Sequence, residues 1–251
     1  INTICIECNA FIFKSTEENI SEMNNIAFIF ARGGSKGIKN KNIIDFGDKP
    51  LIAHTIDMAK KSRLFKDIVV STDSEIIRNI SLSYGATVPF LRPNDLATDE
   101  SSEIFSWKHA ISNYDKTIDT FVSLPCTSPL RCYKTINKMI KRYKDIECDL
   151  LLGVTQSHHI PNFNIVNMNN SGKIELNNSH DKQIFRRQDA NNCYNITTYG
   201  YITSPDYIMK TKNLMDGNIH GYILDKSESI DIDDINDFKY AEYLYLNNTN
   251  E

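Results

Sequence analysis

The sequence predicts an α/β protein built on a mainly parallel β-sheet. After Met23, short apolar runs alternate with amphipathic segments of helical period, which is the pattern of parallel strands joined by crossover helices. Runs such as Ile26–Phe30 are continuously apolar, as expected for strands covered on both faces. The chain has 251 residues, 41% of them hydrophobic. This is enough for one good-sized domain with a real core and a small appendage.

The elements follow from these periods and from residues that start or end helices. In chain order, the predicted strands are Ile26–Phe30, Asp67–Thr72, Thr87–Leu91, Asp119–Leu124, Leu150–Thr155, Tyr199–Ile202 and Tyr222–Leu224. The predicted helices are Pro50–Arg63, Glu75–Tyr84, Ser101–Tyr114, Tyr133–Tyr143 and Ile235–Leu246. Pro50 suits a first helical turn, Gly85 suits a helix end, and Ser101 is a possible cap. In the Ser101–Tyr114 helix, we expect the core face to carry Ile104, Phe105, Ala110 and Ile111.

Two segments depart from this alternation. Residues 1–22 precede the first strong strand and are interpreted as an N-terminal extension, so the main domain is expected over residues 23–251. Residues 156–192 are rich in Asn, His, Ser and charge, with a turn at Asn169–Gly172. Short, polar-flanked strands of this kind indicate an arm or a small antiparallel subdomain.

Composition excludes several classes of function. The net charge of −4 disfavours a general nucleic-acid binder, which usually carries a basic face. No apolar run approaches the ~20 residues of a membrane helix. The six cysteines are irregularly spaced, which predicts reduced thiols in a cytoplasmic protein rather than a disulfide framework. Cys5 and Cys8 form a single CxxC, which is weak evidence for zinc without a second pair.

A glycine-rich basic loop follows the first strand. It runs from Ala31 through Arg32, Gly33, Ser35 and Lys36 to Lys41 and Asn42. Ligands of open α/β sheets bind at the carboxyl ends of strands, glycines let backbone N–H groups approach a phosphate, and Arg and Lys add charge. The loop matches neither GxxxxGK[ST] nor GxGxxG. It predicts phosphate binding, with a solvated turn as the alternative.

An acidic segment, Ser229–Asp234, precedes the last helix. If it is a strand, its period of two places Asp231 and Asp233 on one face. Two converging carboxylates repel each other unless a cation such as Mg²⁺ lies between them. The alternative is an acidic helix N-terminus formed with Asp237, and both interpretations can hold together.

Four further motifs lie at strand ends or in the late part of the chain. Thr127, Ser128 and Arg131 follow a buried strand and offer polar contacts to a ligand. The segment Ser71–Ser74 is as consistent with a helix cap as with a site. The two remaining motifs are Arg92 with Asp95–Asp99, and the adjacent arginines Arg186 and Arg187.

Together these motifs resemble the CMP-acylneuraminate synthetase (acylneuraminate cytidylyltransferase) family. The matching segments, in the family's order, are ARGGSKGIKNKN (31–42), VSTDSE (70–75), LRPNDLATDESS (91–102), PCTSPLR (125–131), RRQ (186–188) and SIDIDDINDF (229–238). The resemblance implies a Rossmann-like nucleotidyltransferase fold with a small dimerisation subdomain, and a homodimer in which residues 156–192 reach the partner subunit. It also implies transfer of CMP from CTP to the anomeric hydroxyl of a sialic-acid-like 2-keto sugar acid, with release of pyrophosphate.

The resemblance also implies roles for individual residues. Catalytic roles fall to Arg32, Lys36, Lys41, Asp231 and Asp233, and the last two would bind Mg²⁺. The implied nucleotide-binding residues are Ala31, Arg32, Gly33, Ser35, Lys36, Asn42, Arg92, Asp99, Ser101 and Ser102. The implied sugar-binding residues are Thr127, Ser128, Arg187, Gln188, Thr197 and Tyr201.

Two departures from the family pattern concern the sugar side. Pro125 and Cys126 stand where the family commonly has Gln-Pro, and TTYGYI (197–202) stands where it has NGAIYI. Both are more like the branch that acts on bacterial sialic-acid relatives such as legionaminic acid. The alternatives are CTP-dependent activation of 3-deoxy-octulosonate or a related acid, a sugar-phosphate nucleotidyltransferase, a glycosyltransferase, and a non-catalytic nucleotide- or sugar-binding protein.

Overall fold

The computed structural model describes residues 17–35, 37–98, 100–161, 163–177 and 192–248. Within these residues the strands are β1 (Asn25–Phe30), β2 (Asp45–Phe46), β3 (Lys49–Pro50), β4 (Phe65–Ser71), β5 (Thr120–Ser123), β6 (Leu150–Gln156), β7 (Val166–Met168), β8 (Ile174–Leu176), β9 (Tyr194–Thr203) and β10 (Ile219–Ile223). The α-helices are α1 (Glu17–Glu22), α2 (Leu51–Ser62), α3 (Glu75–Ser83), α4 (Glu103–Ser112), α5 (Tyr133–Asp145), α6 (Pro205–Lys210) and α7 (Ile235–Asn248). Short 3₁₀ turns lie at Lys41–Ile43 and Asn94–Leu96.

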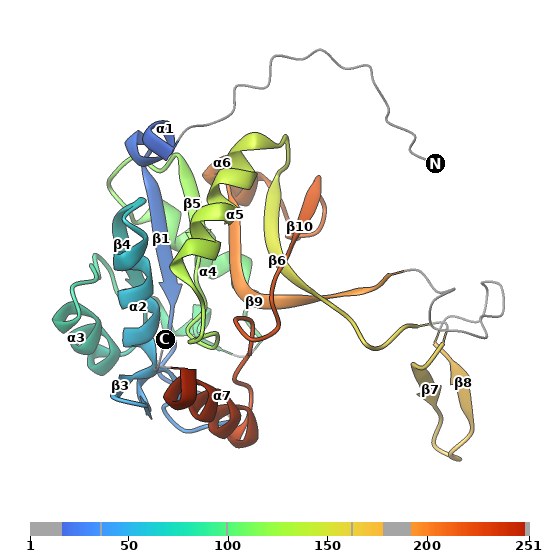
Figure 1. Cartoon of the computed structure of the whole chain (residues 1–251). Coiled ribbons are helices and arrows are strands. Elements are labelled where there is room, and N and C mark those ends of the chain that lie inside the picture. Colours follow the sequence, from blue (N-terminus) through green and yellow to red (C-terminus); the bar gives the residue numbers. More distant parts are fainter. Residues whose placement is uncertain (1–16, 36, 99, 162, 178–191, 249–251) are drawn as a thin grey trace, which may run out of the picture.

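The central sheet has the strand order β10-β6-β9-β5-β1-β4 among the described residues. The pairs β1/β4, β1/β5 and β10/β6 are parallel, whereas β9 is antiparallel to both β5 and β6. The prediction of an α/β fold with a mainly parallel sheet is therefore confirmed. Because β1, β4 and β5 run in the same direction, the loops after them meet at one edge of the sheet (Figure 1).

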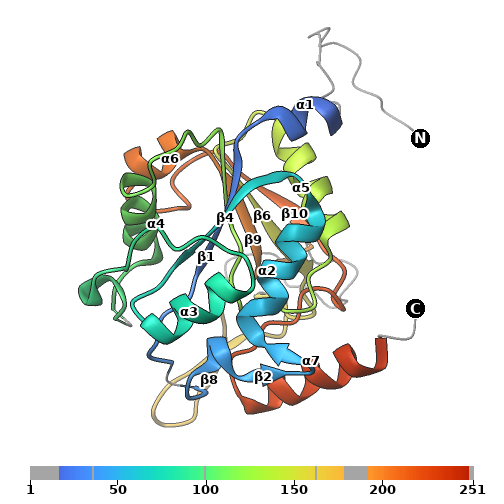
Figure 2. The same ribbon diagram turned by 90° about the vertical axis from the view of Figure 1, so that its left-hand side faces the viewer.

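Helices cover both faces of this sheet, as the continuous apolar runs predict. In β1, Ala27 and Ile29 contribute to the core under α2, α3 and α5. Ile26 and Phe28 point to the opposite core, under α4 and α6. The period of two in strands thus gives β1 two buried faces. A smaller core joins α7 to the β2–β3 ribbon, and both lie at the same end of the body (Figure 2).

Several predicted helix ends are observed. Ser74 caps α3, because its Oγ accepts from the Ile77 N–H at 3.4 Å. Gly85 follows that helix with φ +85°, the left-handed conformation that glycine adopts without cost. Pro50 is the residue before α2.

Three predictions about local structure are wrong. Thr87–Leu91 is not a strand: only isolated bridges join Thr87 to Val69 and Leu91 to Thr72, and Pro89 lies between them without an N–H to donate. Phe105 faces out with 54% of its side chain exposed, because Trp107 and Ala110 share the inward face of α4 with Ile104. Ser102 rather than Ser101 precedes α4.

The region after β6 forms a hairpin that projects from the body (Figure 1). Strands β7 and β8 pair antiparallel, and Gly172 turns the chain with φ +83°. Short antiparallel strands were predicted here. Residues 178–191 lie outside the described residues.

No helix among the described residues combines the length and apolar character needed to cross a membrane.

Candidate active site

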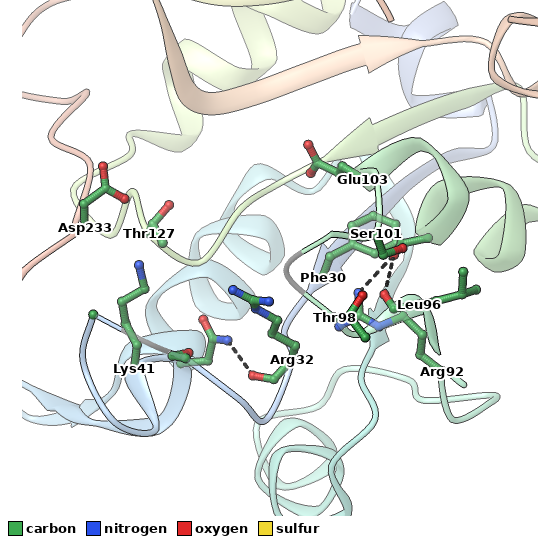
Figure 3. A pocket seen from close by; sticks show the side chains of 14 residues that line it. Phe30, Arg32, Lys41, Arg92, Leu96, Thr98, Ser101, Glu103, Thr127 and Asp233 are labelled. Atoms are coloured by element: carbon green, nitrogen blue, oxygen red, sulfur yellow. Dashed lines mark hydrogen bonds between the residues drawn. The ribbon is translucent and has the colours of Figure 1, made fainter. Parts of the chain in front are cut away.

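A cavity of about 460 Å³ opens at the carboxyl ends of β1 and β5. Eight predicted site residues line it: Arg32, Ser35, Lys41, Asn42, Arg92, Ser101, Thr127 and Asp233. Figure 3 shows that Lys41, Thr127 and Asp233 gather at one side of this cavity, that Arg92, Leu96, Thr98 and Ser101 lie at the other, and that Arg32 lies between them. The cavity therefore joins a part rich in charge to a part with mixed polar and apolar walls.

The glycine-rich loop is held in place at both ends. At its start, Ala31 is fully buried and its N–H donates to the Ser71 carbonyl at 3.0 Å. At its end, the Asn42 side-chain amide donates to the Arg32 carbonyl at 3.0 Å, which closes the loop on itself. The side chains of Arg32 and Lys41 then face one cavity. Lys36 lies outside the described residues.

The motif at the end of β4, Ser71–Ser74, holds the glycine-rich loop through Asp73. The Asp73 carboxylate accepts from the Gly33 N–H at 2.9 Å and lies 3.9 Å from the Arg92 guanidinium. This segment is thus both a helix cap, through Ser74, and part of the site's scaffold. The helix cap and the support of the loop explain the contacts of Ser71–Ser74 without a ligand.

Arg92 brings a buried positive charge to the cavity. Its side chain is 5% exposed, and its Nη1 donates to Ser106 Oγ at 3.3 Å. Burial lowers the pKa of Arg92, while the charge of Asp73 acts in the opposite direction. Ser101 lines the same cavity, whereas Ser102 lies outside it. Asp99 lies outside the described residues.

The acidic segment, Ser229–Asp234, is not a strand. The prediction that the period of a strand puts Asp231 and Asp233 on one face is therefore wrong. Ile232 is fully buried between the two acids and its N–H donates to the Thr127 carbonyl at 2.9 Å. The Ile232 carbonyl in turn accepts from Lys41 Nζ at 2.7 Å. Tertiary contacts, rather than the pleat of a strand, therefore bring Asp233 to the cavity, whereas Asp231 does not line it.

The two carboxylates repel each other. The charge of Asp231 is the largest cause of a raised pKa at Asp233, and burial adds to it. Asp231 Oδ1 is buried and has no hydrogen-bond partner among the described residues. Asp237 accepts from the N–H groups of Asp233 and Asp234 at 3.1 and 3.0 Å, so the same segment also caps α7. The interpretation as an acidic helix N-terminus is therefore confirmed, and the cation site stays a prediction.

The loop after β5 points most of its polar groups into the protein. Thr127 lines the cavity, but Ser128 is fully buried and its Oγ bonds to Thr198 Oγ1 at 2.9 Å. Arg131 is 5% exposed and bonds to backbone carbonyls of the fold. Cys126, one of the departures from the family pattern, is buried in the core, and burial raises the pKa of its thiol to about 12. Ser128 and Arg131 therefore use these polar groups in contacts within the fold.

A second cavity, of about 450 Å³, adjoins the first along the start of α4. Tyr201 and Ser102 line it, and Glu103 lines both cavities. Thr197 does not line either one, and its Oγ1 donates to the Gly153 carbonyl at 2.9 Å. Arg187 and Gln188 lie outside the described residues.

Leu96 and Thr98 belong to the motif of Arg92 with Asp95–Asp99, whereas sequence reasoning missed three residues of the main cavity: Phe30, Glu103 and Ser106. Glu103 is the most informative, because its side chain lines both cavities. Desolvation raises the pKa of Glu103, against the opposing charge of Arg92. Its position directly after the matched LRPNDLATDESS segment is the feature of the sequence that could have identified Glu103 as a site residue.

Comparison with known proteins agrees with this geometry. Residues 26–249 match the family model described as cytidylyltransferase. The chain belongs to the cytidylyltransferase family. It is 36% identical over 219 residues to the N-acylneuraminate cytidylyltransferase of Escherichia coli, covering 86% of this chain and 51% of that protein. It is 33% identical over 220 residues to the CMP-N,N'-diacetyllegionaminic acid synthase of Campylobacter jejuni, covering 86% and 92%.

The fold of this cytidylyltransferase has close structural counterparts. A solved structure of CMP:2-keto-3-deoxy-manno-octonic acid synthetase in complex with CTP superposes with a TM-score of 0.69 at 13% identity. The superposition covers 90% of this chain and 99% of that one. At this identity the likeness concerns the fold. The family match makes the chain a nucleotidyltransferase enzyme, and the superposition agrees with the predicted fold class.

Proposed function

We propose that this cytidylyltransferase transfers CMP from CTP to the anomeric hydroxyl of a sialic-acid-like 2-keto sugar acid, a nonulosonate, and releases pyrophosphate. The observation that carries this proposal is the cavity in which Arg32 and Lys41 face Asp233, in a chain at least 33% identical to enzymes named for N-acylneuraminate and diacetyllegionaminate. A triphosphate needs such cations, and the nucleotide needs the mixed walls around Arg92.

The chain's own residues bind and orient the reactants. Arg32 and Lys41 offset the triphosphate charge, and the closed glycine loop holds the phosphates in one orientation for attack at the α-phosphorus. The cavity around Tyr201, which shares Glu103 with the main cavity, is the proposed place of the sugar acid. Little covalent chemistry is asked of the protein, so positioning and charge stabilisation supply most of the acceleration.

The residues present fit a divalent cation. Two repelling carboxylates, one with a buried oxygen that lacks a partner, are the donors that Mg²⁺ prefers. No group of three or more His, Cys, Asp or Glu side chains with metal-binding geometry occurs in the described part of the chain. Asp231 and Asp233 would therefore hold Mg²⁺ together with phosphate oxygens and water. When bound, the ion would neutralise phosphate charge.

The β7–β8 hairpin supports a homodimer. Its apolar side chains are exposed on both strands: Val166, Met168, Ile174 and Leu176. An exposed apolar patch on a projecting hairpin favours contact with a second copy of the chain. Sedimentation analysis of the wild type and of Met168→Asp checks this: a dimer that dissociates on substitution is expected, and a monomeric wild type would refute it.

The first test of the reaction measures pyrophosphate release from CTP and Mg²⁺. The acids to compare are N-acetylneuraminic, legionaminic, pseudaminic and 3-deoxy-octulosonic acids. We expect turnover with one or two nine-carbon acids, which a chelator abolishes and which UTP does not support. Turnover with 3-deoxy-octulosonic acid alone would establish the alternative substrate. No release with any acid, despite CTP binding, would contradict the proposal.

A further inference from the structure

Tyr199 carries a buried hydroxyl that the reaction does not use. Its side chain is fully buried, and Tyr199 Oη donates to Glu228 Oε2 at 2.8 Å. The same hydroxyl accepts from the Cys132 N–H at 3.0 Å. Hydrogen bonds to a charged group are among the stronger ones in proteins. This bond joins strand β9 to the loop that carries the acidic residues.

Arg131 fixes the position of Tyr199. Arg131 Nε donates to the Tyr199 carbonyl, and its Nη2 donates to the carbonyls of Pro125 and Thr198 at 2.8 and 3.2 Å. The guanidinium carbon also lies 5.4 Å from the centre of the Tyr199 ring. These bonds of Arg131 hold Tyr199 against the loop after β5, so its hydroxyl has little freedom to move.

Glu228 lies three residues before Asp231, on the segment that leads to the two carboxylates. This segment is tied at two points, once to the loop after β5 and once to strand β9. Ile232 bonds to the Thr127 carbonyl, and Glu228 bonds to Tyr199 beside Cys132. Asp231 sits between the two ties, and its Oδ1 makes no hydrogen bond that would hold the carboxylate in place.

We propose that Tyr199 and Glu228 are positioning residues, whose hydrogen bond holds the 228–233 segment so that Asp231 lies close to Asp233, which lines the cavity. The role of those carboxylates in metal binding rests on the proposed function. Substitution of residues that orient metal ligands without contacting the metal typically lowers metal affinity by about 10- to 100-fold. The sequence offers no signal for this pair, because 29 positions separate them.

The test compares Tyr199→Phe and Glu228→Ala with a matched control, Tyr114→Phe. Tyr114 Oη donates to Asp67 Oδ2 at 2.9 Å, so the control removes a tyrosine–carboxylate bond of the same kind. Asp67 lies in the first half of β4, whereas the cavity opens beyond the ends of the strands.

Two readouts are used, and the first needs no metal. Amide hydrogen exchange in residues 228–233 of the metal-free protein should be faster in Tyr199→Phe and in Glu228→Ala, and unchanged in Tyr114→Phe. The second readout is the affinity for Mn²⁺, followed by electron paramagnetic resonance, which should fall by the order of tenfold in the first two variants. The double variant should behave like Tyr199→Phe, because that substitution already removes the bond to Glu228.

Unchanged exchange in 228–233 would overturn the proposal, and so would faster exchange with unchanged Mn²⁺ affinity. If the wild type itself fails to bind Mn²⁺, the metal role under the proposed function is wrong, and the exchange result alone decides whether the bond positions the segment.

Discussion

Substitution of Gly37 by alanine tests how closely the glycine loop and the acidic segment must approach. A Cβ on Gly37 would lie 2.5 Å from the Asp233 carbonyl oxygen, where ordinary contact begins at 3.4 Å. The obstructing atom belongs to the backbone, so the two segments must separate by about 0.9 Å. The φ of Gly37 is not positive, so the loss would come from this contact and not from backbone strain.

A displacement of about 1 Å in a catalytic arrangement can reduce the rate about 100-fold. We therefore expect Gly37→Ala to lower kcat of pyrophosphate release by about two orders of magnitude. Overpacking costs about 1–3 kcal/mol in stability. For a domain of this size that lowers Tm by about 2–4 °C per kcal/mol. Thermal unfolding would show that the fold persists.

The same loop supplies graded controls. A Cβ on Gly34 meets nothing within 4 Å, and one on Gly33 meets Ser74 Cβ at 3.2 Å. The loss of kcat should increase from Gly34→Ala through Gly33→Ala to Gly37→Ala. Equal kcat in the Gly34 and Gly37 variants would refute the reasoning, because the contact with Asp233 would then have no catalytic consequence.

Four further predictions follow from charge and burial. Asp233→Asn should lower kcat far more than CTP affinity, and equal loss of both would contradict the assigned role. The charge of Asp231 raises the pKa of the Asp233 carboxyl above its unfolded value. The ionised Asp233 therefore destabilises the metal-free fold at pH values above this raised pKa, and the stability recovers as the pH falls through the raised pKa. Asp233→Asn should therefore raise Tm at pH 7 without metal and have little effect at pH 3; a lower Tm at pH 7 would be inconsistent. Arg92→Met should weaken CTP binding at least tenfold by calorimetry, because a buried hydrogen-bonded charge is lost. The control Arg78→Met, at an exposed arginine, should leave the affinity for CTP unchanged. Equal CTP affinities of the two variants would refute this prediction. Cys126 should resist iodoacetamide until the protein unfolds, because burial raises its pKa to about 12, and labelling of the native protein would show the thiol is accessible.

The sequence alone determined those features that depend on neighbours along the chain. Continuous apolar runs predicted strands buried on both faces, and Ser74 and Gly85 marked the ends of α3, because capping and a positive φ are local requirements. The motif order also predicted the family and most of the residues that line the main cavity. These signals depend on residue type and spacing within a few positions.

Only the tertiary structure decided which side chains meet. Lys41 bonds to the Ile232 carbonyl across 191 positions, and Gly37 abuts Asp233, although neither segment carries a signal for the other. Ser128 turns into the protein because the antiparallel strand β9 brings Thr198 beside it. Such contacts depend on strand order and on the packing of loops at one edge of the sheet. A chain's local periodicity does not contain that information.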